Sequence, residues 1–262
     1  MLLAGLGLGA VIALHISSRP HGQLLASGAG PVLTEIGRVS GLVGTYMSAL
    51  VVLLAARIPV IEREVGQDRL VRWHRILGPY AIWLIVVHMS FTLLGYAATV
   101  QVGVLAQMWQ FIAHVRWMLP AFVGFALFLM IGITSYKQVR RRMRYEVWWV
   151  THLYIYIGIV LAFMHQVEMG QAFATHRLAK VFWLALIGGS LGCLALFRWL
   201  IPVARSRAMG LRVDRVVRES DDTISIWIAG TGLKRLRAKG GQFFSWRDRK
   251  STRLNSSHEW IS

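Results

Sequence analysis

Four histidines lie inside two long apolar segments, and their placement limits the fold of this chain more than any other feature. His74 and His88 lie in RWHRILGPYAIWLIVVHMSF, and His152 and His165 lie in WWVTHLYIYIGIVLAFMHQVE. An ionisable side chain within a membrane-crossing helix costs free energy and generally serves a function. The two histidine pairs therefore require one shared explanation.

The composition places the chain in a lipid bilayer. Its mean hydropathy is +0.51 and its apolar residues, 55% of the total, come in long blocks, so we expect an all-α, multi-pass membrane protein. The net charge of +17 arises from short clusters of Lys and Arg between these blocks, which is typical of cytoplasmic loops, and nucleic-acid binding is not expected. Cys193 is the sole cysteine, which excludes a disulfide framework, a cysteine-based metal site and covalent C-x-x-C-H attachment of a heme.

The apolar blocks predict a six-helix transmembrane domain over residues 1–203. The predicted helices lie near residues 2–17, 37–56, 73–99, 117–135, 147–167 and 178–201. The first would be about 24 Å long against a hydrocarbon core of about 30 Å, so we expect its natural start upstream of Met1. Residues 19–31 and 57–72 are predicted as loops, and residues 100–116 as an exposed or interfacial segment. Three glycines of the second helix would allow close helix packing, namely Gly37, Gly41 and Gly44.

The basic residues predict the orientation of these helices. The connections after the second and fourth helices carry four and five Lys or Arg residues, and Arg205 and Arg207 follow the sixth helix. The other three connections carry one or two basic residues each. The positive-inside rule therefore predicts that the basic loops and both termini lie in the cytoplasm. The membrane that we expect is the plasma membrane.

This orientation makes the third and fifth predicted helices parallel. His88 follows His74 by 14 residues and His165 follows His152 by 13, which correspond to rises of about 21 and 20 Å. Matched rises place His74 level with His152, and His88 level with His165. In an ideal helix, 13 residues turn His165 about 140° away from the face on which His152 lies. We therefore expect a local distortion of the fifth helix or a lateral offset of the groups bound there.

Two facing imidazoles at each of two depths suit low-spin heme iron, which takes one axial nitrogen from each side. Zinc prefers four ligands around one ion, and a proton relay in a membrane usually includes Asp or Glu, which are absent between the histidines of either segment. For any single histidine, a hydrogen bond between helices is the alternative role. The remaining candidates are Arg57, Arg72 and Arg75 for heme propionates, with His15, His21, His114 and His176 unassigned and expected in solvated or interfacial positions.

The H-x13-H and H-x12-H pairs on the third and fifth of six predicted helices resemble the ferric reductase transmembrane domain shared by NADPH oxidases and ferric-chelate reductases. The resemblance covers roughly residues 37–201. It implies two b-type hemes, with His74 and His152 ligating the inner iron and His88 and His165 the outer iron. It also implies electron transfer from NAD(P)H through FAD to the inner heme, then the outer heme, then an extracytoplasmic acceptor such as oxygen or ferric iron.

Residues 208–247 resemble the start of the ferredoxin-reductase-type FAD-binding barrel of the same family. LRVDRVVRES and DTISIWIAG predict two strands around the turn-forming SDD, and GLKRLRAKGGQFFSW follows. The R-x-Y-[ST] flavin motif and the Gly-rich nucleotide loop of the family do not follow. Residues 248–262 resemble translated sequencing-adapter text, so we expect a non-native tail, a natural protein that continues further, and a chain that is not active alone.

Two alternative functions stay open. One is a heme-only cytochrome b subunit that takes electrons from quinol or from a separate flavoprotein. The other is a transporter or structural membrane protein whose histidines only bridge helices. No motif in the chain specifies the external acceptor, the choice between NADH and NADPH, the heme potentials or the oligomeric state.

Overall fold

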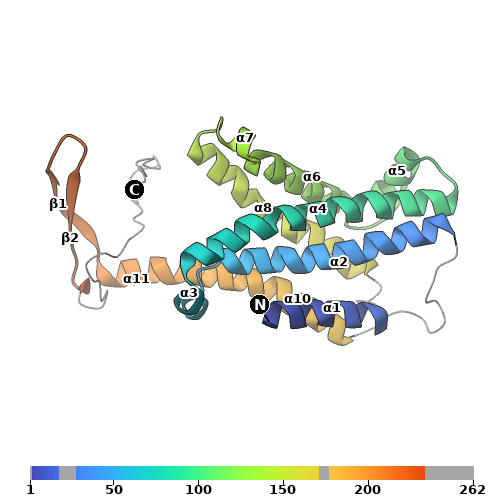
Figure 1. Cartoon of the computed structure of the whole chain (residues 1–262), viewed down its shortest axis with the longest axis horizontal. Coiled ribbons are helices and arrows are strands. Elements are labelled where there is room, and N and C mark those ends of the chain that lie inside the picture. The colour runs from blue at the N-terminus through green and yellow to red at the C-terminus, as the bar shows by residue number, and fades with distance from the viewer. Residues whose placement is uncertain (1, 18–27, 171–176, 234–262) are drawn as a thin grey trace. The chain divides into compact units, whose positions relative to one another are not determined.

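The computed structural model of the chain describes residues 2–17, 28–170 and 177–233. Helices make up most of this part, and an antiparallel hairpin follows them (Figure 1). Contacts divide the chain into two units, residues 1–194 and residues 195–262.

The first unit is a bundle of helices. Its elements are α1 (Leu2–Ser17), α2 (Ala29–Ala55), α3 (Pro59–Val65), α4 (Gln67–Val100), α5 (Val104–His114), α6 (Met118–Ser135), α7 (Lys137–Arg140), α8 (Tyr145–Met169) and α10 (Arg177–Leu194). In the described part, five helices are long and apolar enough to cross a membrane: α2, α4, α6, α8 and the helical run Arg177–Met209. At 16 residues α1 is shorter, so a sixth crossing stays a prediction.

The outward faces of the long helices are apolar, as a lipid environment requires. Trp83 of α4 is 66% exposed, Ile133 of α6 is 60% exposed and Ile157 of α8 is 50% exposed. Exposing so many large apolar side chains to water would be unfavourable, because soluble proteins rarely present apolar patches of this extent. The helix lengths and these faces together make the chain a multi-pass membrane protein.

The described part has helical segments in each of the six predicted ranges, and two segments predicted as loops, together with the predicted exposed or interfacial segment, contain helix. Residues 29–31 form the start of α2, where Pro31 is tolerated because the first N–H groups of a helix have no intrahelical partner. Residues 57–72 contain α3, which begins at Pro59, and the first turns of α4. Residues 100–116 contain α5, whose apolar residues recur at helical spacing. Residues 18–27 lie outside the described part.

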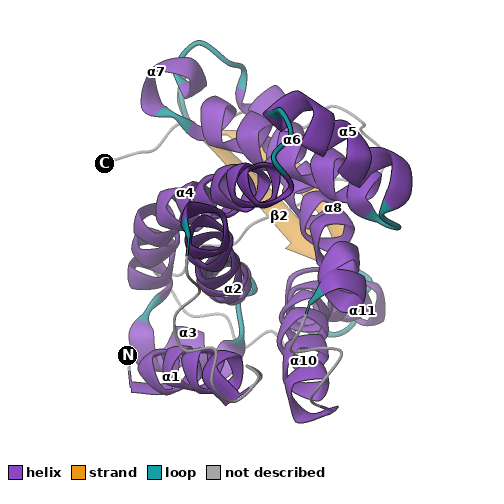
Figure 2. Ribbon diagram, turned by 90° about the vertical axis from the view of Figure 1, so that its right-hand side faces the viewer, coloured by secondary structure: helices purple, strands orange, loops and turns teal. Residues whose placement is uncertain are grey.

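Helices α2 and α4 lie alongside one another over most of their length (Figures 1 and 2). A Cβ added at Gly37 would overlap Thr92, and one at Gly44 would come within 3.0 Å of Ile85. Small residues let the two backbones approach closely, because no side chain stands between them. The close packing predicted at Gly37, Gly41 and Gly44 is confirmed.

Helices α6 and α8 form a second closely packed pair. A Cβ on Gly124 of α6 would lie 2.9 Å from the carbonyl oxygen of Gly158 on α8. The two histidine-bearing helices, α4 and α8, thus belong to different tight pairs. The histidines lie where one pair faces the other.

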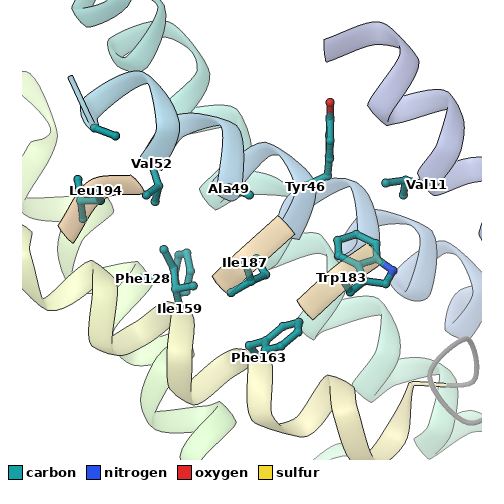
Figure 3. Packing of buried hydrophobic residues seen from close by; sticks show 11 residues of the cluster. Val11, Tyr46, Ala49, Val52, Phe128, Ile159, Phe163, Trp183, Ile187 and Leu194 are labelled. Atoms are coloured by element: carbon teal, nitrogen blue, oxygen red, sulfur yellow. The ribbon is translucent and has the colours of Figure 1, made fainter. Parts of the chain in front are cut away.

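A buried apolar cluster joins these pairs to α1 and α10 (Figure 3). Trp183 of α10 is its largest fully buried side chain, at 1% exposure. The other members labelled in Figure 3 are Val11 of α1; Tyr46, Ala49 and Val52 of α2; Phe128 of α6; Ile159 and Phe163 of α8; and Ile187 and Leu194 of α10. Helix α1 is fixed to α2 here as well, since the Tyr46 hydroxyl donates a 2.7 Å hydrogen bond to the Ala4 carbonyl.

The second unit contains a π-helical turn (Ala195–Leu200), α11 (Ile201–Met209) and a hairpin of β1 (Arg212–Arg218) and β2 (Ile224–Ala229). Pro202, which cannot donate a helical hydrogen bond, lies at the start of α11, directly after the π-helical turn. The strands pair antiparallel, with Arg218 opposite Ile224. The two predicted strands and their turn are confirmed. The predicted continuation of the barrel, residues 234–247, lies outside the described residues, as does the predicted tail.

Candidate functional site

Helix α4 positions two of the four histidines on one face. His74 and His88 are separated by almost four helical turns, and Pro79 lies between them. Proline lacks the N–H that would bond to the carbonyl of Arg75, so α4 can bend between the two histidines. The other pair lies on α8, which is continuous α-helix from Tyr145 to Met169. Of the two expected alternatives, a local distortion of this helix is therefore not seen, and a lateral offset of the bound groups stays a prediction.

The structure brings the histidines together in two pairs, one from each helix. The ring centroids of His74 and His152 are 6.1 Å apart, with an interplanar angle of 64°. Those of His88 and His165 are 6.0 Å apart, with an interplanar angle of 28°. The pairs are not crossed, which agrees with helices α4 and α8 running in the same direction.

Backbone carbonyls of α2 orient both histidines of α4. His74 Nδ1 donates to the Val51 carbonyl at 3.0 Å, and His88 Nδ1 donates to the Gly37 carbonyl at 2.8 Å. A carbonyl can only accept, so Nδ1 carries the proton and Nε2 of the neutral ring carries the lone pair. Metal-ligating histidines typically have their second nitrogen held in this way.

The ring separation is the one expected for two imidazoles on opposite sides of a single metal ion. Two metal–nitrogen bonds of about 2 Å, and about 1 Å from each ring centre to its nitrogen, add up to about 6 Å. Both pairs have this separation. Direct stacking of the rings would bring them closer together.

Each pair offers a metal ion only two protein ligands. Among the described residues, no group of three or more His, Cys, Asp or Glu side chains is placed to hold a metal ion. A six-coordinate ion between two imidazoles would need four further ligands in the plane between them. The nitrogens of a tetrapyrrole supply such a plane, so the donor set fits a heme better than a free ion.

A cavity adjoins the second pair, between α2, α4, α6 and α8. His88 and His165 line it together with apolar side chains that include Phe122 and Phe125. Its volume of about 210 Å³ is many times the 10–15 Å³ or so that one water needs. The cavity therefore has space for a ligand of many atoms with a mainly apolar surface.

The first pair is extended by an aromatic and cationic stack. The indole of Trp148 lies on the His152 ring, with centroids 5.1 Å apart, and the Arg140 guanidinium lies 4.0 Å from the centroid of Trp148. Sequence analysis missed both residues. The signal was present, since Trp148 precedes His152 by four residues and thus shares its helix face.

The three arginines predicted to contact propionates differ in their surroundings. Arg57 makes a 3.0 Å ion pair with Glu62, so its charge is already compensated there. Arg72 and Arg75 are exposed on α4, near His74 in sequence. Their contact with propionates stays a prediction.

The histidines to which no role is assigned also differ in their surroundings. His114 is exposed on α5 and bonds to the Gln110 carbonyl within its own helix, as expected for an interfacial role. His15 is 13% exposed at its side chain and forms a 2.6 Å ion pair with Glu35 of α2. His15 is therefore largely withdrawn from solvent, and an interfacial role for it stays a prediction. His21 and His176 lie outside the described residues.

Comparison with known families agrees with this geometry. Residues 40–163 match the family model described as ferric reductase like transmembrane component. This part of the chain is therefore similar to the ferric reductase-like transmembrane component. The matched residues include His74, His88 and His152 and end two residues before His165. No curated protein matches the chain. The description of the matched family points to electron transfer across a membrane.

Proposed function

We propose that this chain carries electrons across a membrane through two b-type hemes. His74 and His152 hold the heme on the cytoplasmic side, and His88 and His165 hold the heme on the extracytoplasmic side. The observation that supports this proposal most directly is the separation of about 6 Å in both pairs. The family match over residues 40–163 points to the same kind of chemistry.

A bound heme supplies one-electron redox chemistry at each site. The residues of the chain orient the ligands: the carbonyls of Val51 and Gly37 accept hydrogen bonds from Nδ1 of the α4 histidines, which puts the proton of each neutral ring on Nδ1 and fixes the ring orientation. The surrounding apolar helices exclude water, which favours transfer between buried centres without side reactions.

In the full pathway that we propose, NAD(P)H reduces FAD, and electrons then pass from the cytoplasmic heme to the extracytoplasmic heme and on to oxygen or ferric iron. The antiparallel hairpin of β1 and β2 supports the FAD part of this proposal, because we expect an FAD-binding barrel to begin with two such strands joined by a turn. The plasma membrane is the proposed location, with both termini in the cytoplasm.

The test is a set of alanine substitutions at the four histidines, read by absorption spectroscopy. Chain purified in detergent after growth with added hemin is expected to show a Soret band and a reduced α-band from two hemes. A potentiometric titration separates the two hemes by midpoint potential. His74→Ala and His152→Ala should remove the same component, and His88→Ala and His165→Ala should remove the other.

His114→Ala is the matched control, because it removes an exposed histidine of α5 that lies in neither pair. It should leave both components in place. Absence of a Soret band in the unmodified chain would contradict the proposal. A crossed pattern, in which His74→Ala and His165→Ala remove the same component, would contradict the pairing alone.

A further inference from the structure

The densest basic cluster of the chain lies in the connection between α6 and α8. Five exposed basic residues occupy eight consecutive positions, namely Lys137, Arg140, Arg141, Arg142 and Arg144. No acidic residue lies among them. Within the described part of the chain, the cluster makes one ion pair, between Arg144 and Glu146 at 3.8 Å. An exposed pair of this kind compensates little charge, so the cluster stays strongly positive.

Membrane topology does not by itself account for a basic cluster without acidic residues. The connection after α2, residues 57–72, carries four arginines but also Glu62, Glu64 and Asp68, so its charges nearly balance. The positive-inside rule counts Lys and Arg and is almost insensitive to Asp and Glu. Both connections therefore satisfy that rule, and only the one after α6 also has a large net charge. Such a charge attracts a partner of opposite sign.

The local backbone holds these cations close together. The N–H of Arg141 donates to the Lys137 carbonyl at 3.2 Å, and the N–H of Met143 donates to the Arg140 carbonyl at 3.2 Å. The Arg140 guanidinium lies 4.0 Å from the ring centroid of Trp148 on α8, a contact that attaches the connection to this helix. The cluster is thus a turned segment with a fixed anchor, in which neighbouring cations can contact one anionic group.

The cluster lies at the ends of two helices that are long and apolar enough to cross a membrane. Helix α6 ends at Ser135 and α8 begins at Tyr145. Tyr136 and Tyr145 flank the cluster and are 60% and 53% exposed. Tyrosine is enriched where a membrane helix meets the lipid headgroups. These positions place the basic residues at the depth of the lipid phosphates.

We propose that Lys137, Arg141, Arg142 and Arg144 bind the headgroups of anionic phospholipids, with Arg140 fixing the segment to α8. A guanidinium presents a planar fork of N–H donors that matches two phosphate oxygens. Basic clusters of this size beside a membrane helix favour lipids with a net negative charge. A zwitterionic phospholipid carries its own cation beside the phosphate, so it is attracted less. The proposal does not depend on a heme or on electron transfer.

The experiment measures which lipids contact the protein. The whole chain is reconstituted in phosphatidylcholine bilayers that contain a trace of spin-labelled phosphatidylglycerol or spin-labelled phosphatidylcholine. Electron paramagnetic resonance separates lipid held at the protein surface from bulk lipid. The ratio of the two association constants is the preference for the anionic headgroup.

Two double variants remove the same charge from the two connections. Arg141→Gln with Arg142→Gln removes two exposed cations from the cluster, and Arg63→Gln with Arg69→Gln removes two exposed cations from the balanced connection. A third variant, Arg141→Lys with Arg142→Lys, keeps the charge of the cluster. Circular dichroism compares the helix content of each variant with that of the unmodified chain.

The unmodified chain should prefer phosphatidylglycerol to phosphatidylcholine. The glutamine variant of the cluster should lower this preference by as much as about fivefold for each charge removed. The lysine variant should keep most of the preference, and the variant at Arg63 and Arg69 should keep nearly all of it. In about 1 M salt, where the Debye length is about 3 Å, the preference of the unmodified chain should decrease strongly.

The inference is overturned if the unmodified chain shows no preference for phosphatidylglycerol, the outcome expected if the cluster binds only an acidic protein surface. Equal losses in the two glutamine variants would also overturn it, because net charge alone would then explain the preference. If the glutamine variant of the cluster loses helix content, the lysine variant and the salt dependence of the unmodified chain decide. None of these measurements uses a heme, so their failure is distinct from failure of the proposed function.

Discussion

The imidazole of His88 lies directly against the backbone of Gly41, where a Cβ would approach His88 Nδ1 to 2.5 Å. The same nitrogen donates to the Gly37 carbonyl one turn away on α2. Helix α2 therefore acts as the support for this ring through two glycines. The heme-ligating geometry that we propose depends on a helix that carries no ligand itself.

The first prediction concerns this support. Gly41→Ala should displace the His88 ring and lower occupancy of the heme bound by His88 and His165, with a cost of about 1–3 kcal/mol for the overpacked contact. The ratio of heme to protein after purification measures this effect, and the heme of the other pair should be retained. Gly188→Ala on α10 is the control, since a Cβ there meets nothing within 4 Å. Equal heme loss in both variants would contradict the prediction.

The second prediction concerns the angle between paired rings. The planes of His74 and His152 differ by 64°, and those of His88 and His165 by 28°. Two crossed imidazoles make the iron d orbitals that they contact more nearly equal in energy. The oxidised His74–His152 heme should therefore give the electron paramagnetic resonance signal at lower field. Spectra of His88→Ala and His74→Ala assign the signals, and a reversed assignment would contradict these ring orientations.

The third prediction uses the cationic stack on His152. Arg140→Gln removes a positive charge that lies over Trp148, which itself lies on the His152 ring. Because a nearby positive charge favours the reduced form, the midpoint potential of this heme should fall by on the order of tens of millivolts at low ionic strength. The other heme should be unaffected. Arg142→Gln, an exposed arginine in the same connection, serves as the control in the same redox titration.

The fourth prediction concerns Arg57. Its guanidinium pairs with Glu62 at 3.0 Å, and both groups are partly exposed, so Arg57→Ala should cost no more than about 1 kcal/mol. Both hemes should remain bound at full stoichiometry with unchanged potentials. A clear loss of one heme, measured by pyridine hemochrome assay, would restore Arg57 as a propionate ligand.

The helices and the histidine pairing could be predicted because the signals are local. Hydropathy over about 20 residues marks a span, and a constant rise per residue sets the depth of each histidine along its helix. Direction then follows from basic loops. These rules need no knowledge of which helices lie side by side, so they were sufficient to match His74 with His152 and His88 with His165.

The neighbours of each histidine could not be obtained in that way. Whether His15 faces Glu35, or the Val51 carbonyl faces His74, depends on helix rotation and on which helix packs alongside. The glycines of α2 decide the second, because they allow α4 to approach closely at their own face. Local pattern thus establishes the membrane class and the four histidines, whereas close packing of α2 with α4 and α1 selects the groups that orient the rings and place a charged pair beside them.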